Sequence, residues 1–461
     1  MTGAIHNLDW DRICGELTGI EILRDRTQVA KLSQDYHHFS PILQSQLQGK
    51  VGDIVVRPTR EIEVLKVARI CVKYRIPLTV RGAGTGNYGQ CVPLQGGVIL
   101  DLSKMNQISW IKPGLACVEP GVKLAALDKQ AQEIGWELRM VPSTYRTATI
   151  GGFVGGGSGG IGSINYGQLR DRGNLQAVRV VTMEEEPRVL ELRGDQVQKV
   201  NHAYGTNGII TELEIPLAPA FNWTELIIGF DDFMTAARFG QALGESDGIV
   251  KKLICVCAWP IPSYFAAFRE ILTEQKHWAF VLIEESNQTA FQDLVCEFKG
   301  EVCYQKSAQD SHKGTTIIEY TWNHTTLHAR SVNPSLTYLQ TLFPLDSKLK
   351  LVEHCYQHFN QNVNQTNHPE VIPHLEFIRT QGKVAAAALQ IVQFTTEERL
   401  NEIIQYHESR GALIFNPHTY LLEDGGMKTV NHEQLEFKQY IDPYGLLNPG
   451  KMRAWIDVND H

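Results

Sequence analysis

The 461-residue sequence lacks any long block of lysine or arginine, and its formal net charge is −8. Because a protein that binds the nucleic-acid backbone needs a basic surface, this composition argues against a nucleic acid partner. No stretch is long and apolar enough to span a bilayer, and the first residues do not place a basic segment before an apolar core. We therefore expect no integral membrane segment and a cytoplasmic location.

The sequence also lacks the cysteine pattern of a disulfide framework, since its nine cysteines are odd in number and scattered. Cys255 and Cys257 flank one valine in an apolar segment, so they would share one face of a strand. No second cysteine pair and no nearby cysteine and histidine set completes the four ligands of a zinc site. We expect these two cysteines to be buried packing residues and expect no metal.

Glycine, in contrast, is concentrated in two clusters, at residues 81–89 and 151–162. Glycine is costly in regular structure, so such runs indicate a positive φ or a main chain that approaches a ligand too closely for a Cβ. Successive backbone N–H groups can bind a pyrophosphate without one cationic side chain for each oxygen. The two clusters therefore predict a site for a phosphate-bearing cofactor.

A Rossmann fold that binds a nicotinamide cofactor is the alternative, because the first cluster contains Gly82-x-Gly84-x-Gly86. That fingerprint needs a helix directly after the glycines. Here further glycines and a proline follow, and the helix expected at residues 61–75 comes before the strand at residues 78–81. The sequence therefore favours a cofactor site built from loops over an NAD-dependent dehydrogenase.

The chain shows no internal repeat, but its pattern changes near Phe221. Before that residue, short strands and helices alternate, and a hairpin is expected around residues 177–192. After it, β-like runs separated by amphipathic helices predict a mixed α+β cap. We expect strands at residues 223–230, 253–259, 278–283, 316–321 and 384–392, and helices at residues 233–243 and 334–342.

Four stretches, in this order, resemble the vanillyl-alcohol-oxidase and p-cresol-methylhydroxylase (PCMH) superfamily of flavoproteins. They are residues 77–86, 148–162, 205–211 and 442–451. The similarity covers roughly residues 35–220 and 410–453. Within the superfamily, the sequence is most similar to the branch that contains D-lactate dehydrogenases and the FAD-binding chain of glycolate oxidase.

The resemblance implies an α+β fold in three parts. Residues 1–220 would form a PCMH-type FAD-binding domain of two α/β subdomains. Residues 221–415 would form a substrate-binding α+β cap domain with an antiparallel sheet, and residues 416–461 would return to the FAD domain.

The resemblance also implies which residues line the FAD. They are Arg81, Gly82, Ala83, Gly84, Thr85, Gly86, Asn87, Ser143, Thr149, Gly151, Gly152, Gly155, Gly156, Gly157, Ser158, Gly159, Gly160, Gly208, Ile209, Asn448 and Lys451. Some relatives attach the flavin covalently through a histidine at the place of Thr85 or through a cysteine in the later loop. Neither residue is present here, so we expect non-covalent FAD.

The implied activity is that of an FAD-linked oxidase or dehydrogenase that acts on CH–OH donors. Flavin N5 would take a hydride from a small 2-hydroxy acid, alcohol or sugar, and a base would take the hydroxyl proton. The electron acceptor could be oxygen, a quinone or a protein carrier. A flavin-binding protein with a catalytically impaired cap is the alternative, because the Glu-His-Gly and His-x-His-x-Gly-Asp-Gly elements of the nearest branch are not intact.

Four side chains are candidates for the chemistry. His418 remains where the branch has Glu-His-Gly, and it is our first candidate for proton acceptor or substrate orienter. Tyr420 could bind the same substrate oxygen, with packing within a strand as the other interpretation. His324 would share a strand face with Tyr320 and Trp322, with half-buried sheet surface as the other interpretation. Arg379 could bind a substrate carboxylate or form a surface ion pair.

Overall fold

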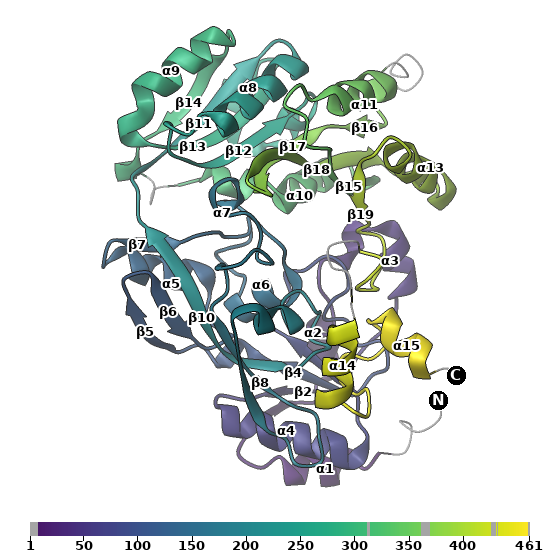
Figure 1. Cartoon of the computed structure of the whole chain (residues 1–461). Helices are drawn as coiled ribbons and strands as arrows, with labels where there is room; N and C mark the ends of the chain where they lie inside the picture. Colours follow the sequence, from purple (N-terminus) through teal and green to yellow (C-terminus); the bar gives the residue numbers. More distant parts are fainter. Residues whose placement is uncertain (1–7, 311–313, 361–368, 426–429, 431, 460–461) are drawn as a thin grey trace.

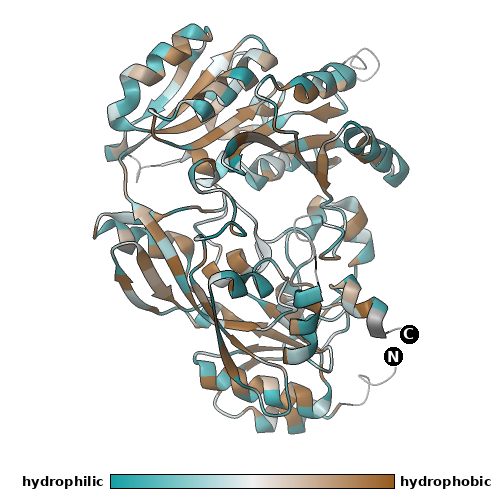
Figure 2. Ribbon diagram, viewed as in Figure 1, coloured by the Kyte–Doolittle hydropathy of each residue, from teal (hydrophilic) through white to brown (hydrophobic). Residues whose placement is uncertain are grey.

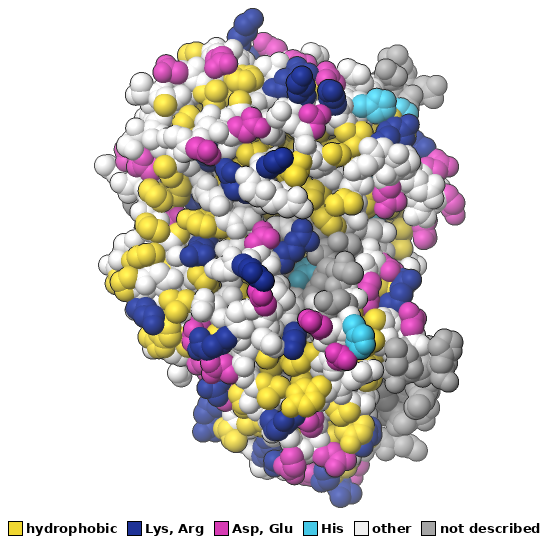
Figure 3. Space-filling model, viewed as in Figure 1, with side chains coloured by type: hydrophobic (Ala, Val, Ile, Leu, Met, Phe, Trp, Pro, Cys, Tyr) yellow, Lys and Arg dark blue, Asp and Glu magenta, His cyan; other side chains and the backbone are white. Residues whose placement is uncertain are grey.

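The computed structural model describes residues 8–310, 314–360, 369–425, 430 and 432–459. Three sheets organise the chain, with two in the lower half of Figure 1 and one in the upper half. In Figure 2 the strands are mostly hydrophobic, whereas the outer helices carry hydrophilic faces. On the face shown in Figure 3, basic and acidic side chains are interspersed. None of the helices in the described ranges is both long and apolar enough to cross a membrane.

The first sheet has the strand order β1-β2-β4-β3. Its strands are β1 (Glu21–Leu23), β2 (Ile54–Arg57), β3 (Leu78–Arg81) and β4 (Val98–Asp101). β2, β4 and β3 are parallel, and β1 is an antiparallel edge strand. Between β2 and β3 runs α4 (Glu61–Tyr74), whose buried Val64, Val67 and Cys71 recur at helical spacing. The predicted helix before β3 is therefore confirmed.

Helices α1 (Trp10–Glu16), α2 (Arg26–Leu32) and α3 (Pro41–Gln46) precede or flank this sheet. Each begins with a side-chain N-cap, because Asp9, Asp25 and Ser40 accept hydrogen bonds from the backbone of the first turn. Ser40 therefore determines where α3 starts, close to the cap in Figure 1.

The second sheet is antiparallel, with the order β5-β6-β10-β8-β9 and β7 paired to β10. Its strands are β5 (Ile108–Lys112), β6 (Leu115–Val118), β7 (Trp136–Leu138), β8 (Ala177–Val181), β9 (Val189–Arg193) and β10 (Ile209–Pro219). The predicted hairpin is the β8–β9 pair. Helices α5 (Leu124–Gln132), α6 (Ile150–Gly156) and α7 (Ser163–Tyr166) lie between β6 and β8 in the chain.

The third sheet is the cap, with the order β14-β11-β13-β12-β17-β18-β15-β19 and β16 paired to β18. Its strands are β11 (Trp223–Phe230), β12 (Lys251–Cys257), β13 (His277–Glu284), β14 (Glu301–Lys306), β15 (Leu336–Leu342), β16 (Val371–Ile372), β17 (His374–Thr380), β18 (Lys383–Gln393) and β19 (Leu413–Phe415). The helices between them are α8 (Phe233–Glu245), α9 (Gln288–Glu297), α10 (Asn323–Val332), α11 (Lys350–Asn360) and α13 (Glu397–Glu408).

The C-terminal segment returns to the first sheet, where α14 (His432–Ile441) and α15 (Arg453–Asn459) lie beside the N-terminal elements in Figure 1. Leu78 of β3 donates its N–H to Leu446 O at 2.8 Å, and Asn448 N donates to Leu78 O at 2.8 Å. The predicted α+β class with an antiparallel cap sheet is confirmed. The division near residue 220 falls between β10 and β11, which belong to different sheets, and this supports the proposed three parts.

Two predicted elements are wrong. Residues 334–342 contain strand β15 instead of a helix. Because β15 lies between β18 and β19 and is buried on both faces, it lacks the alternation that distinguishes a strand from a buried helix. Residues 316–321 contain the 3₁₀ helix Ile317–Tyr320 instead of a strand, and the buried Glu225 carboxylate accepts hydrogen bonds from Thr316 Oγ1 and Ile317 N at its start.

Candidate cofactor site and active site

The two glycine clusters lie on one cavity, whose empty space is about 1510 Å³ including the part that is open to solvent. Arg81 ends strand β3 and residues 82–87 follow it, whereas residues 151–159 comprise most of helix α6 and the loop after it. The two clusters therefore border one common space, to which the cap also contributes side chains.

The two clusters touch each other where neither carries a large side chain. A Cβ added to Gly82 would lie 2.1 Å from Thr149 Oγ1. Thr149 is itself held in place, because it caps α6 and accepts a hydrogen bond of 3.3 Å from Gly152 N. Glycine at position 82 is therefore required by this close approach. In contrast, a Cβ added to Gly155 would meet nothing within 4 Å.

Arg81 holds the first glycine cluster in place through hydrogen bonds to backbone carbonyl groups. Its guanidinium donates to Leu32 O, to Gln34 O at 3.3 Å and to Ala83 O at 3.3 Å. The side chain lines the cavity but is only 7% exposed. Arg81 therefore ties the loop after β3 to the segment that follows α2.

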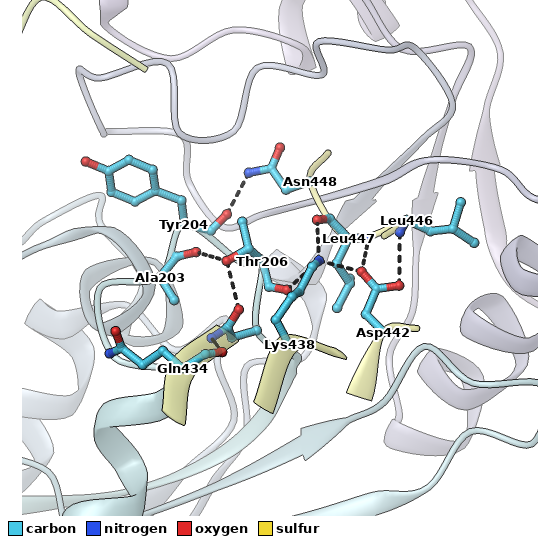
Figure 4. Close-up of polar contacts among 10 residues, drawn as sticks. Ala203, Tyr204, Thr206, Gln434, Lys438, Asp442, Leu446, Leu447 and Asn448 are labelled. Carbon is cyan, nitrogen blue, oxygen red and sulfur yellow. Dashed lines mark hydrogen bonds and ion pairs between the residues drawn. The ribbon is translucent and has the colours of Figure 1, made fainter. Parts of the chain in front are cut away.

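The C-terminal segment braces a third stretch of the wall, residues 204–208 (Figure 4). Asn448 Nδ2 donates to Tyr204 O at 2.6 Å, and Lys438 Nζ donates to Thr206 O at 2.8 Å. Lys438 also forms a buried ion pair of 2.5 Å with Asp442, which accepts hydrogen bonds from the N–H groups of Leu446 and Leu447. Helix α14 is thus joined to the cavity wall through polar groups that have no access to water.

Several side-chain atoms on the lining residues are buried and have no hydrogen-bond partner within the described ranges. They are Asp35 Oδ2, Asn87 Nδ2, Tyr204 Oη, Trp322 Nε1 and Asn323 Oδ1. Buried polar atoms are nearly always paired. Their convergence on one cavity is therefore the signature of a polar ligand site.

The pattern of the FAD binding domain family matches residues 52–190, which include both glycine clusters. Residues 52–190 are an FAD-binding domain. The chain is 32% identical to a D-lactate dehydrogenase of Anaerostipes hadrus over 203 residues, or 41% of each protein. It is 29% identical to glycolate oxidase subunit GlcD of Bacillus subtilis (strain 168) over 214 residues, or 44% of each. The match thus spans less than half the length of either relative.

A solved structure of an alkyldihydroxyacetonephosphate synthase superposes with a TM-score of 0.73 at 17% identity. The superposition covers 98% of this chain and 87% of that chain. This likeness concerns the fold, and it extends beyond the FAD-binding domain to the cap.

The residues fit FAD, which is the cofactor of this domain. The glycine-lined walls leave the main chain accessible, the cavity is large, and unpaired donors and acceptors line it. Most of the lining predicted from the sequence lies on the cavity. These residues are Arg81, Gly82, Ala83, Gly84, Thr85, Gly86, Asn87, Ser143, Thr149, Gly151, Gly152, Gly155, Gly156, Gly157, Ser158, Gly159 and Gly208.

Four residues of the predicted FAD lining do not lie on the cavity. Gly160 is a glycine for another reason, because a Cβ there would lie 2.2 Å from Val141 O. Ile209 is fully buried in β10, and its neighbours Gly208 and Ile210 line the cavity instead. Asn448 and Lys451 support the wall from behind. Lys451 Nζ donates to Gly89 O at 2.6 Å, and burial lowers its pKa to about 7.

His418 and Tyr420 do not reach the cavity of the FAD-binding domain. Both ring nitrogens of His418 are used, since Nε2 donates to Tyr338 O at 2.9 Å and Nδ1 accepts from Ser40 Oγ at 2.7 Å. Burial lowers the pKa of His418 to about 4. Tyr420 packs near Gly89, and Lys451 Nζ lies 5.0 Å from the centre of its ring. The structure thus places His418 between α3 and the cap sheet, and Tyr420 against α3 and residues 89–94.

His324 and Arg379 are also absent from the lining. The predicted strand face of Tyr320, Trp322 and His324 does not exist, because α10 begins at Asn323. His324 is half-buried in that helix, and desolvation lowers its pKa to about 4. Arg379 is engaged at the β17–β18 turn, where it donates to Ile164 O at 3.2 Å and Gly382 O at 3.1 Å.

The cap contributes four residues to the cavity, Trp322, Asn323, Gln340 and Leu389, and Tyr88 Oη donates to Gln340 Oε1 across the boundary. Five lining residues were not predicted from the sequence, namely Asp35, Tyr88, Tyr204, Asn323 and Gln340. Tyr204 directly precedes a motif that the sequence showed, so it could have been found. Asp35 and Gln340 stand in no motif, and only the fold brings them to the site.

Proposed function

We propose that the protein is an FAD-dependent oxidoreductase that oxidises a small hydroxyl-bearing substrate, of the 2-hydroxy-acid or the alcohol and sugar type. The observation that carries the proposal is the extension of the FAD-domain cavity to the cap, where polar side chains without partners line it. Bound FAD supplies a two-electron acceptor for the hydride. A D-lactate dehydrogenase and a glycolate oxidase subunit among the relatives support 2-hydroxy acids as the first donors to test.

We assign substrate binding to Tyr204 and Asn323. Both residues line the cavity, and Tyr204 Oη and Asn323 Oδ1 are buried and have no partner within the described ranges. Burial holds the pKa of Tyr204 well above its usual value, so its hydroxyl stays a donor. A donor and an acceptor on opposite sides of the domain boundary suit a substrate with a hydroxyl and a carboxylate or carbonyl oxygen.

We assign proton removal to Asp35. Among the described lining residues it is the one acidic side chain, and it is 7% exposed. Its Oδ1 accepts from His37 N at 3.0 Å and lies 3.0 Å from His37 Nδ1, whereas Oδ2 has no partner among the residues that the structure describes. His37 therefore orients the carboxylate, and the free oxygen can accept the substrate hydroxyl proton.

The test is an anaerobic screen of purified protein in which donors are mixed with the bound flavin and its absorbance is followed. We expect glycolate, D-lactate or another small hydroxy compound to bleach the wild-type flavin. The Asp35→Asn variant should retain FAD and reduce it at least about tenfold more slowly, as is typical for loss of a general base. The Arg379→Ala variant should match the wild type, because Arg379 lies outside the cavity. Equal rates in wild type and Asp35→Asn would remove Asp35 from the mechanism.

A flavin-binding protein with an inactive cap is the second candidate function. One observation favours it, since Trp322, Asn323, Gln340 and Leu389, the cap residues on the cavity, have no ionisable side chain. Under this alternative the protein would bind FAD, and no donor would bleach it. NAD-dependent dehydrogenation has less support. The dinucleotide fingerprint needs a helix directly after the glycines, and residues 82–97, all of which the structure describes, contain none.

A further inference from the structure

Four side chains with metal-binding atoms meet in the cap sheet. Cys255 and Cys257 lie on β12, and His374 and Glu376 lie on the neighbouring strand β17. The register pairs Cys257 with His374 and Cys255 with Glu376. Because alternate residues share one face of a strand, all four side chains emerge on the same side of the sheet. No partner for the two cysteines was visible in the sequence, because the fold brings it from a strand more than a hundred residues away.

The spacing of the two sulfurs and the imidazole nitrogen suits three ligands of a tetrahedral zinc site. The two sulfurs are 3.8 Å apart, and Cys255 Sγ lies 3.3 Å from His374 Nε2. The ligand atoms of Cys255, Cys257 and His374 all lie within 4.8 Å of one another. Two sulfurs at the usual Zn–S bond length, at a tetrahedral angle, are separated by about 3.8 Å. The side chains are thus already arranged around a point that a zinc ion would occupy.

The histidine ring is oriented as a metal ligand. His374 Nδ1 lies 3.2 Å from Leu389 O, which can accept a hydrogen bond from it. In the tautomer that makes this hydrogen bond, the lone pair is on Nε2, which faces the two cysteines. A backbone carbonyl that binds the other ring nitrogen is the common outer contact of metal-binding histidines.

Glu376 lies beside these three residues and offers a fourth ligand. Its Oε1 lies 3.0 Å from His374 Nε2. In the tautomer with the hydrogen on Nδ1, both atoms present lone pairs and repel each other unless a cation lies between them. The side chains of His374 and Glu376 are at most 1% exposed, so water does not screen the repulsion. Thr325 Oγ1, at 3.4 Å from His374 Nε2, is the neighbouring hydroxyl.

We infer that Cys255, Cys257, His374 and Glu376 bind one structural zinc ion. Two thiolates, an imidazole and a carboxylate are ligands that zinc accepts in a closed four-coordinate site. The set differs from the His-x-His-x-Gly-Asp-Gly element that the family resemblance would have implied. The zinc proposal does not depend on the proposed substrate or activity.

The ion would stabilise the cap side of the cofactor cavity. Glu376 Oε1 accepts from Trp322 N at 2.6 Å, and His374 is bonded to Leu389 O. Trp322 and Leu389 both line the cavity. Trp322 has a φ of 51°, a conformation that large side chains rarely adopt unless the surroundings hold it. A bound zinc ion would therefore fix Glu376, and Glu376 would hold Trp322 in position.

The first experiment needs no variant. Protein produced with added zinc is analysed for metal by mass spectrometry, then stripped with a chelator and titrated with Co²⁺ alone. We expect one zinc per chain, and thiolate-to-cobalt charge-transfer bands together with visible bands at wavelengths longer than flavin absorption. Protein that contains no zinc and gives no cobalt–thiolate bands would overturn the proposal, and a hydrogen bond from His374 Nε2 to Glu376 Oε1 would then account for their 3.0 Å contact.

Variants then identify the ligands. Cys257→Ser and Glu376→Gln should each lower zinc affinity at least roughly tenfold. Cys355→Ser is the matched control, because Cys355 is a buried cysteine in α11 outside this cluster. If Cys257→Ser does not fold, the wild-type protein serves as the test instead. Its midpoint of thermal unfolding is measured before and after the metal is removed with a chelator. A lower midpoint that added zinc restores supports the site, and an unchanged midpoint contradicts a structural ion.

Discussion

Gln90 Nε2 donates a hydrogen bond of 3.0 Å to Gly156 O, so a single side chain joins the two glycine clusters. The amide lies in the space that side chains at both clusters would need. A Cβ on Gly86 would be 2.1 Å from Gln90 Oε1, and one on Gly156 would be 3.3 Å from Gln90 Nε2. The glycines at these two positions therefore serve the contact between loops as well as access to the cofactor.

Replacing Gln90 by alanine should weaken FAD binding without unfolding the protein. Loss of one such hydrogen bond costs about 1 kcal/mol, or roughly a fivefold increase in Kd. Titration of apoprotein with FAD, followed by quenching of flavin fluorescence, measures the change. Gln48→Ala at an exposed position is the control. An unchanged Kd in Gln90→Ala would show that the loops hold their positions without this bond.

Replacing Gly155 by leucine should prevent FAD from binding while preserving the fold. Gly155 lies on the cavity within α6, and a Cβ there would meet no protein atom within 4 Å. Leucine is also the better helix former, by up to about 1 kcal/mol. We expect colourless protein with wild-type circular dichroism.

The matched control for that change is Gly15→Leu, since Gly15 is an exposed helical glycine in α1 with the same free space around its Cβ position. This variant should purify with flavin. Retention of flavin by Gly155→Leu would show that the cofactor does not occupy the space in front of α6.

Breaking the buried ion pair behind the cavity wall should destabilise the protein. Asp442→Asn leaves Lys438 without a counter-charge, while the side chains of both residues are at most 2% exposed. Removal of one partner of a buried pair costs about 3–5 kcal/mol. Denaturant unfolding at a fixed FAD concentration measures the loss. Asp195→Asn breaks the exposed pair with Arg172 and should change stability by less than ~1 kcal/mol.

His418 should make the folded protein sensitive to acid. Burial lowers its pKa to about 4 from the usual 6.5, so between these values the unfolded chain binds a proton that the folded chain does not. Stability therefore falls as the pH decreases from about 6.5 to about 4, and this contribution stops changing below that. Between pH 7 and pH 5 the effect is about 2 kcal/mol.

The His418→Gln variant should lose that part of the pH dependence in unfolding experiments at pH 7 and pH 5. The exposed His432→Gln variant should keep the wild-type dependence. His324, whose pKa burial also lowers to about 4, contributes a similar decrease and remains in both variants. Identical slopes in wild type and His418→Gln would contradict a neutral, buried His418.

The cofactor lining was predictable because it is local in sequence. Residues 81–87 and 151–159 contain glycines that the main-chain geometry itself requires, and such requirements can be read from composition and spacing. The catalytic candidates were harder to predict. His418 stands where a family motif has a histidine, yet its ring is used to join α3 to the cap sheet.

The secondary structure of two cap segments was predicted wrongly because tertiary contacts, and not the local sequence pattern, determine it. The β-branched run at residues 316–318 looks like a strand, but the buried carboxylate of Glu225 binds its backbone and starts a 3₁₀ turn. Leu336 to Leu342 has no alternation because both of its faces are buried. Neither the position of Glu225 nor the second buried face can be deduced from the segment alone.

The sequence by itself determined the glycine-rich main chain of the FAD-binding domain, the order of its strands along the chain and the presence of a separate β-rich cap. These features depend on backbone freedom and on hydrophobic periodicity, which short segments carry. Only the tertiary structure decided that Asp35, Tyr204 and Asn323 share one cavity and that His374 and Glu376 meet Cys255 and Cys257. These contacts depend on strand register and on how the cap packs against the FAD-binding domain, and both result from packing of the whole chain.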